Sequence, residues 1–236
     1  MRSNDLAALV LHVKAYRETS SMVQFFTQDL GRLVGVMKGL RRGRNPVQIQ
    51  PFNFGSLSCF GRGSMVTVTQ FDVQGRYALN GDALGAGFYV FELISRCLAE
   101  HQSEPVVFAA VHKVLTELDH GEQLAPCLRV FETALLTQLG YGADYQHEAD
   151  SGTAIDPQGW YEKVADSGFM PSESGHPNAI PGWVLLSIER RDFSDIKVLR
   201  AAKMLNQQSL APLLGSKPLL SRSLLSGATL TRQPKA

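Results

Sequence analysis

The strongest constraint on the fold is a change in the spacing of apolar residues at Gly81. Before it, short runs rich in apolar residues follow one another without a helical repeat, at 6–14, 21–27, 32–37, 50–60 and 64–72. Residues 64–72 alternate apolar and polar side chains, as a half-buried strand does. Because closure removes the exposed edges of a sheet, we expect these five strands to form a small antiparallel barrel.

After Gly81 the apolar residues recur every three or four positions, which predicts helices. The stripes cover 84–98, 105–119, 122–139 and 195–210, the last ending at Pro212, and its apolar face includes Ile196. A short final helix is expected from Pro218 or Ser221 to 226. We therefore predict an α+β chain with a barrel domain at 1–80, a mainly helical domain at 81–236, and an irregular insertion at about 141–190.

The charges are distributed unevenly along the chain, although the net charge is only +1. Residues 1–80 hold 10 Lys and Arg against 4 Asp and Glu, residues 81–197 hold 7 against 18, and residues 198–236 hold 6 against none. Basic regions that flank an acidic middle favour a polyanionic partner, or else they are solvated charges that cluster without function.

Several kinds of chemistry find no support in the sequence. No GxxxxGK[ST], GxSxG or HExxH pattern occurs, so we expect neither ATP hydrolysis nor catalysis, and no cofactor. His147 and His176 lie near acidic residues in the insertion, but scattered surface histidines are commoner than metal sites. Three widely spaced cysteines, a polar start and no long apolar run favour a cytoplasmic protein without disulfides or membrane spans.

The stretch from Gly31 to Phe52 is the most suggestive of function. Lys38, Arg41, Arg42 and Arg44 fall within seven residues, and no acidic residue lies between Asp29 and Asp72. A strand that leads into a flexible basic loop suits the neutralisation of phosphates, which grips nucleic acid without reading its sequence.

Collinear words in the chain resemble the RecO family. They are VLH at 10–12, YRETS at 16–20, GRL at 31–33, KGLRR at 38–42, QPF at 50–52, GRG at 61–63, GFYVFEL at 87–93, LRVFE at 128–132, LGYG at 139–142 and KPLLSR at 217–222. Each short segment alone is weak evidence of relationship, but the same order of all of them over most of the chain is specific to the family. The match is weakest at 143–190.

The resemblance implies an N-terminal OB fold and a helical C-terminal domain. It also implies a recombination mediator in DNA repair, which binds single- and double-stranded DNA and anneals complementary strands without ATP. Such a protein contacts the tail of single-stranded-DNA-binding protein (SSB) and works with RecR to load RecA, in the cytoplasm at the nucleoid. An RNA-binding OB-fold module and an unrecognised enzyme are the alternatives.

Together with the resemblance, the positions of the basic residues suggest which of them bind each partner. We expect DNA to contact Arg17, Arg32, Lys38, Arg41, Arg42, Arg44 and Arg62. We expect the acidic SSB tail to contact Arg129, Arg200, Lys203, Lys217 and Arg222, with the C-terminal segment packed on the helix that carries Arg129. Arg129 could instead pair with Glu132 or Glu92. Any of Phe52, Phe54, Phe60 and Phe71 could offer a stacking face or belong to the core.

One departure from the family concerns the insertion, where many members carry four zinc-binding cysteines. Residues 141–182 contain no cysteine, so we expect no structural zinc. The apolar residues that we expect to hold the insertion together are Ile155, Trp160, Tyr161, Phe169 and Trp183.

Overall fold

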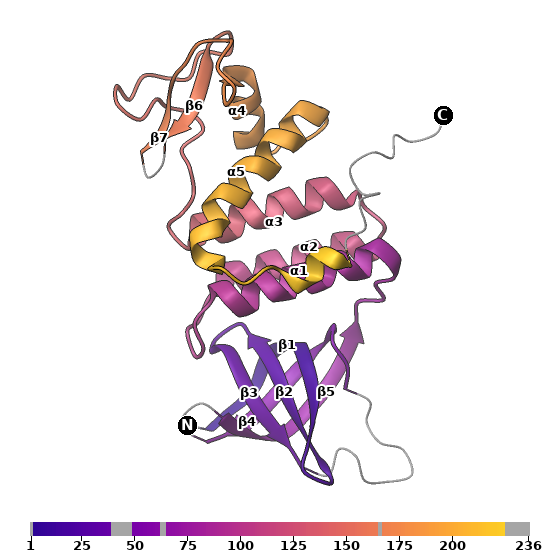
Figure 1. Ribbon diagram of the computed structural model, residues 1–236. Coiled ribbons are helices and arrows are strands. Elements are labelled where there is room, and N and C mark those ends of the chain that lie inside the picture. Colours follow the sequence, from indigo (N-terminus) through magenta and orange to yellow (C-terminus); the bar gives the residue numbers. More distant parts are fainter. Residues whose placement is uncertain (1, 39–48, 62–64, 165–166, 225–236) are drawn as a thin grey trace. The chain divides into compact units, whose positions relative to one another are not determined.

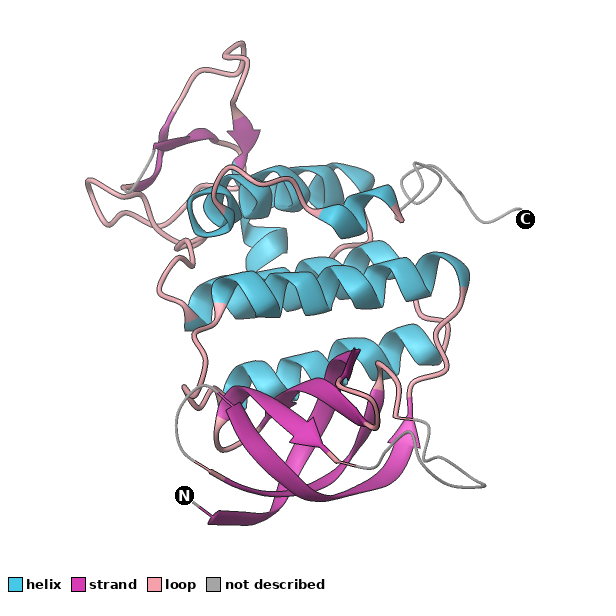
Figure 2. Cartoon of the chain, turned by 60° about the horizontal axis from the view of Figure 1, so that its bottom comes forward, coloured by secondary structure: helices cyan, strands magenta, loops and turns pink. Residues whose placement is uncertain are grey.

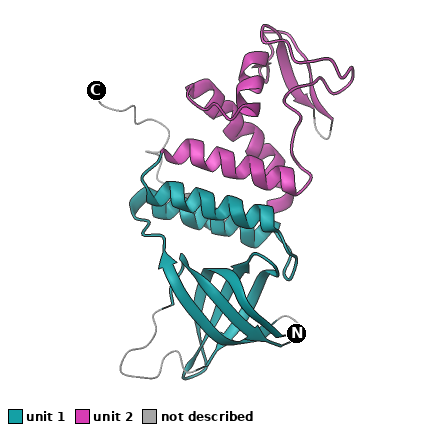
Figure 3. Cartoon of the chain, turned by 180° about the vertical axis from the view of Figure 1, so that it is seen from behind, with its two compact units in different colours: residues 1–122, 216–236 teal, residues 123–215 magenta. Residues whose placement is uncertain are grey.

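A computed structural model describes residues 2–38, 49–61, 65–164 and 167–224. The predicted fold class is confirmed, because five strands come first and are followed mainly by helices (Figure 1). The chain forms two compact units (Figure 3). Unit 1 consists of residues 1–122 and 216–236, and unit 2 consists of residues 123–215. The proposed domain boundary at residue 80 stays a prediction.

The five strands close into a barrel in the order β1-β2-β3-β5-β4 (Figure 2). They are β1 (Arg2–Tyr16), β2 (Ser20–Thr27), β3 (Gly31–Met37), β4 (Asn53–Phe60) and β5 (Met65–Arg76). All neighbours are antiparallel except β3 and β5, and β4 pairs with β1 to close the barrel. This is the strand order of the OB fold.

Alternation of side chains along the strands fills the barrel interior with aliphatic and aromatic residues. Phe25 and Leu57 are fully buried there, and Phe71 packs edge-on to Phe25 at a ring separation of 5.2 Å. A shift in the β4–β5 register near Ser58 allows both Val68 and Phe71 to face inward, although they lie three residues apart.

Unit 1 also contains α1 (Gly81–Cys97), α2 (Pro105–Asp119) and the short 3₁₀ helix η1 (Leu220–Ser223). Phe52 connects the barrel to α1, because its ring stacks on Phe91 at 4.5 Å. Phe26 connects it to α2 through Phe108 at 5.4 Å. These aromatic contacts bury apolar surface of both helices, so α1 and α2 pack with the barrel as one body.

Unit 2 contains α3 (Leu124–Gln138), β6 (Trp160–Val164), β7 (Gly168–Pro171), β8 (Ile180–Pro181), α4 (Gly182–Glu189) and α5 (Ile196–Leu214). The insertion is more regular than predicted, since β7, β6 and β8 form a small sheet. The predicted end at Pro212 is wrong: α5 continues to Leu214, because a proline in the last turn removes only one helical hydrogen bond.

The apolar core of unit 2 includes most of the side chains expected to hold the insertion. Ile155, Tyr161 and Phe169 are buried in it, and Trp183 packs against it partly buried. Trp160 is 36% exposed and lies outside this core. Within the described ranges, no group of three or more His, Cys, Asp or Glu side chains is arranged to hold a metal ion, and no helix is long and apolar enough to cross a membrane.

Candidate nucleic-acid interface

The basic loop begins directly after β3. Lys38 is exposed and follows the last residue of that strand. Arg41, Arg42 and Arg44 were predicted to bind DNA and lie outside the described residues, as does Arg62. Of the four basic side chains Lys38, Arg41, Arg42 and Arg44, Lys38 is therefore the one that lies among the described residues.

The chain returns from the loop through a tightly bonded turn. Ile49 is buried in the barrel core, and the Asn53 side chain accepts a 2.8 Å hydrogen bond from the backbone N–H of Gln50. Phe52 is fully buried with a φ of 72°, a left-handed conformation that is strained for an aromatic residue. The rings of Phe88 and Phe91 on α1 pack against Phe52 and hold it in this conformation. The end of the loop at Phe52 is therefore anchored within unit 1.

Strand register brings together side chains that are scattered in the sequence. Cross-strand partners point to the same side of a sheet, so a chain of partners marks one line on the barrel surface. We call the line that follows the partners Arg2–Phe60, Phe60–Thr67, Thr67–Val36, Val36–Met22 and Met22–Lys14 the outer row.

The outer row mixes positive charge with exposed apolar surface. Arg2 and Lys14 are exposed at its two ends, and Phe60 between them is 49% exposed. Met65 is exposed in the neighbouring line of partners, where it pairs with Val34. Cations that neutralise phosphates beside an exposed aromatic face form the usual combination for binding single strands.

Phe60 is the one exposed ring among the four phenylalanines considered as stacking faces. Phe52 and Phe71 are buried, and Phe54 is partly buried with its ring 5.1 Å from Tyr77. The other three therefore contribute to packing, and Phe60 has a face that a base can reach.

Arg17 lies at the turn between β1 and β2. It is exposed, has a φ of 53°, and its guanidinium sits 5.2 Å above the ring of Tyr16. No role was predicted for Tyr16, Lys14 or Met65. Lys14 belongs to the same row as Phe60 only through the registers of the strands between them.

Arg32 has structural contacts within unit 1. Its Nε donates a 3.0 Å hydrogen bond to the Leu98 carbonyl, and its own carbonyl accepts one of 2.9 Å from the His101 N–H. Burial lowers the pKa of Arg32, and the charge of Glu100 partly opposes this. These contacts join β3 to the loop between α1 and α2, and a DNA contact by Arg32 stays a prediction.

The residues expected to bind the SSB tail divide between the two units. Arg129 is buried on α3 and Arg200 is exposed on α5 in unit 2, where Lys203 is half-buried. Lys217 is exposed in unit 1, and the side chain of Arg222 lies outside the description. Their assembly into one groove stays a prediction.

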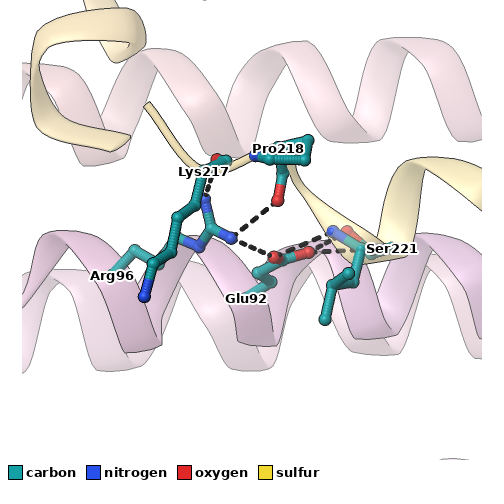
Figure 4. A network of polar contacts seen from close by, with 6 residues as sticks. Glu92, Arg96, Lys217, Pro218 and Ser221 are labelled. Carbon is teal, nitrogen blue, oxygen red and sulfur yellow. Dashed lines mark hydrogen bonds and ion pairs between the residues drawn. The ribbon is translucent and has the colours of Figure 1, made fainter. Parts of the chain in front are cut away.

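Two expectations about this second set need correction. The C-terminal segment was expected on the helix that carries Arg129, whereas the hydrogen bonds of residues 217–221 go to α1 (Figure 4). Ile196 was expected on the buried face of α5, yet it is 44% exposed. It precedes Arg200 and exposed Met204 at four-residue spacing, so α5 presents a mixed apolar and basic line.

The closed five-stranded barrel with its basic loop, and the helical region that follows in the chain, define this protein as an OB-fold protein with a helical extension. Family models agree with it: "Recombination protein O N terminal" matches residues 1–77 and "Recombination protein O C terminal" matches 78–183.

Relatives of similar length support the same family. "DNA repair protein RecO" of Pseudomonas aeruginosa is 40% identical over 219 residues, which cover 92% of this chain and 93% of the relative. The proteins of the same name from Tolumonas auensis and Actinobacillus pleuropneumoniae are 36% and 37% identical and cover 96% and 95% of this chain, and 97% and 95% of their own lengths. The chain belongs to the RecO family.

Proposed function

We propose that this chain acts in DNA repair by binding single- and double-stranded DNA and annealing complementary strands without ATP. The observation that carries the proposal is the direct cross-strand pair of exposed Phe60 and exposed Arg2, on an outer row that also carries exposed Lys14. The row supports sequence-independent binding, because phosphates and base faces are common to every sequence. Membership of the RecO family supports the repair context.

Annealing requires a particular balance of contacts. Lys14 and Lys38 would neutralise phosphates, which lowers the repulsion between two approaching strands. Phe60 would hold one base without occupying its pairing edge, since stacking uses the ring face. Base pairing itself supplies the free energy, so the protein need not hydrolyse a nucleotide, and we propose that it is not an enzyme.

We propose that the SSB tail binds along α5. Arg200 is exposed between Ile196 and Met204, with Lys203 beside them. An acidic peptide that ends in an apolar residue fits such a line, because cations attract its carboxylates and the apolar side chains cover its end. As a family member the chain would then work with RecR to load RecA at the nucleoid.

An annealing assay tests the proposal. Two complementary oligonucleotides, each coated with SSB, are mixed without nucleotide, and duplex formation is followed by fluorescence with and without the protein. We expect acceleration that disappears when the SSB tail is deleted. Acceleration on naked strands alone would contradict the SSB contact, and no acceleration on either substrate would contradict annealing and favour an RNA-binding module.

A further inference from the structure

The small sheet of unit 2 has one face on the core and one face away from it (Figure 1). Tyr161, Phe169 and Ile180 are buried in the core of unit 2 and mark the covered face. Successive side chains of a strand point to opposite sides, and cross-strand partners point to the same side. The opposite face, which we call the Trp160 face, therefore carries Trp160, Glu162 and Val164 of β6, Met170 of β7 and Pro181 of β8.

The Trp160 face presents an aromatic ring among other apolar side chains. Trp160 is 36% exposed, and its cross-strand partner Pro181 is half-buried. Val164 and Met170 are half-buried and, like Trp160, lie outside the apolar core of unit 2. Tryptophan is among the residues that contribute most to protein–protein binding, because its ring buries a large area with few rotatable bonds.

Carboxylates surround the ring of Trp160. Glu162 lies on the same face, and its Oε2 is held 3.0 Å from Nδ1 of His176. Glu173 is exposed, and the residue before it donates its N–H to the Trp160 carbonyl at 2.8 Å. Asp156 is also exposed, and its carbonyl accepts a 3.0 Å hydrogen bond from the N–H of the residue before Trp160. The ring therefore lies within an acidic rim.

Positive charge is scarce in this part of the chain. Residues 141–182 hold seven Asp and Glu but a single basic residue, Lys163. Lys163 belongs to the covered side of the sheet, where its Nζ donates a 2.5 Å hydrogen bond to Ser209 of α5. It therefore does not offset the carboxylates of the Trp160 face. Such a surface repels the phosphates of nucleic acid and attracts a cationic protein.

We propose that the Trp160 face binds an arginine-bearing surface of another protein. A guanidinium is planar and weakly hydrated, so one can stack on the Trp160 ring while others pair with the carboxylates of the rim. Val164 and Met170 would contact the aliphatic parts of the arginine side chains. The proposal goes beyond DNA binding and does not rest on it, because it uses residues of unit 2 alone.

Hexaarginine is the probe that tests the proposal in the full chain. The chain has two tryptophans, Trp160 and Trp183, so ¹⁵N labelling gives two indole N–H signals, which the variant Trp160→Phe assigns. We expect hexaarginine to shift the Trp160 signal until it saturates. The Trp183 signal should stay in place, because that side chain packs against the core of unit 2. Hexalysine should bind more weakly, since an ammonium group cannot pair bidentately with a carboxylate.

Two variants separate stacking from charge. Trp160→Ala should weaken hexaarginine binding by about two- to fivefold, as expected for the loss of an exposed cation–π contact. Glu162→Gln keeps the ring, removes one carboxylate charge, and should weaken binding while reducing its dependence on salt. Tyr141→Ala is the matched control, because it removes another exposed aromatic side chain of unit 2 and should leave the affinity unchanged.

Four results would overturn the proposal. Equal shifts of both indole signals would show a general effect of the peptide. Unchanged affinity in both Trp160→Ala and Glu162→Gln would place the peptide elsewhere on the acidic surface. Equal affinity for hexalysine would remove the preference for arginine. Self-association of the full chain that is lost in Trp160→Ala, measured by analytical ultracentrifugation, would assign the face to a second copy of this chain instead.

Discussion

Arg129 and Glu132 form an ion pair inside unit 2, with Nη2 of Arg129 2.6 Å from Oε1 of Glu132. Their side chains are only 9% and 1% exposed. Asn206 of α5 donates to the other carboxylate oxygen at 3.1 Å, so the pair also connects α3 to α5. A charge in this position is part of the core.

Arg129→Ala should therefore destabilise unit 2 before it affects any partner. Removing one member of a buried pair leaves the other charge uncompensated and costs roughly 3–5 kcal/mol. Both tryptophans, Trp160 and Trp183, lie in unit 2, so tryptophan fluorescence during urea unfolding follows this unit. His147→Ala removes an exposed contact with Asp144 in the same unit and should cost less than about 1 kcal/mol. Equal costs would contradict a core role for Arg129.

The free energy of unfolding should decrease as the pH is lowered, because of His112 on α2. Nδ1 of His112 lies 2.6 Å from the Tyr77 hydroxyl, and its buried Nε2 has no hydrogen-bond partner among the described residues. Burial lowers the pKa of His112 below its ordinary value of 6.5. As pH falls through 6.5 the unfolded chain binds a proton that the folded chain does not, so the free energy of unfolding decreases until the folded pKa is reached.

Differential scanning calorimetry between pH 7.5 and 5 measures this effect. The loss should approach at most about 1.4 kcal/mol per pH unit from this group. His112→Phe should unfold with a shallower pH dependence than the native chain. Identical slopes for the native chain and His112→Phe would show that His112 titrates normally when folded.

Phe60 should distinguish single strands from duplexes. Its exposed ring can stack on an unpaired base, but not on bases already stacked within a duplex. Phe60→Ala should weaken oligonucleotide binding by about fivefold or more, from a stacking contribution of roughly 1–3 kcal/mol per base, with a smaller effect on duplex. Val73→Ala removes another exposed apolar side chain from β5 and should leave both affinities unchanged in fluorescence anisotropy. Equal losses on both forms of DNA would argue against stacking.

Gly31 should tolerate no side chain. Its φ is 64°, and a Cβ atom would lie 1.8 Å from the carbonyl oxygen of Gln102, in the loop that Arg32 also binds. Gly81→Ala is the matched control, since its φ is 50° and nothing lies within 4 Å. The control should cost about 1–2 kcal/mol for the left-handed backbone, and Gly31→Ala about 1–3 kcal/mol more for overpacking. Thermal unfolding by circular dichroism measures both, and similar costs would show that the loop moves aside easily.

Apolar spacing alone predicted much of the fold. Most of the strands follow from short apolar runs, β5 follows from the alternation at 64–72, and most of the helices follow from a repeat of three to four residues. The helix α4 was not predicted, because its eight residues are too few for a clear stripe. The end of α5 was also misplaced, since a proline near a helix terminus removes little.

Much of the candidate interface could not be predicted, because it depends on contacts between distant residues. The Leu98 carbonyl that accepts from Arg32 is 66 positions away, so the half-buried environment of Arg32 has no local signal. The outer row depends on the registers of all five strands, and these registers could not be predicted from a single sequence. By contrast, the Arg129–Glu132 pair is local, and its three-residue helical spacing already made it an open alternative.

The most direct test of the account is the salt dependence of single-strand binding. Lys38, Arg41, Arg42 and Arg44 are replaced together by Ala, and affinity for an oligonucleotide is measured over a range of salt concentrations. If all four contact phosphates, the slope of log affinity against log salt should flatten by up to roughly 3, from about 0.7 per contact. An unchanged slope would show that the loop after β3 does not hold DNA, and the central claim would fail.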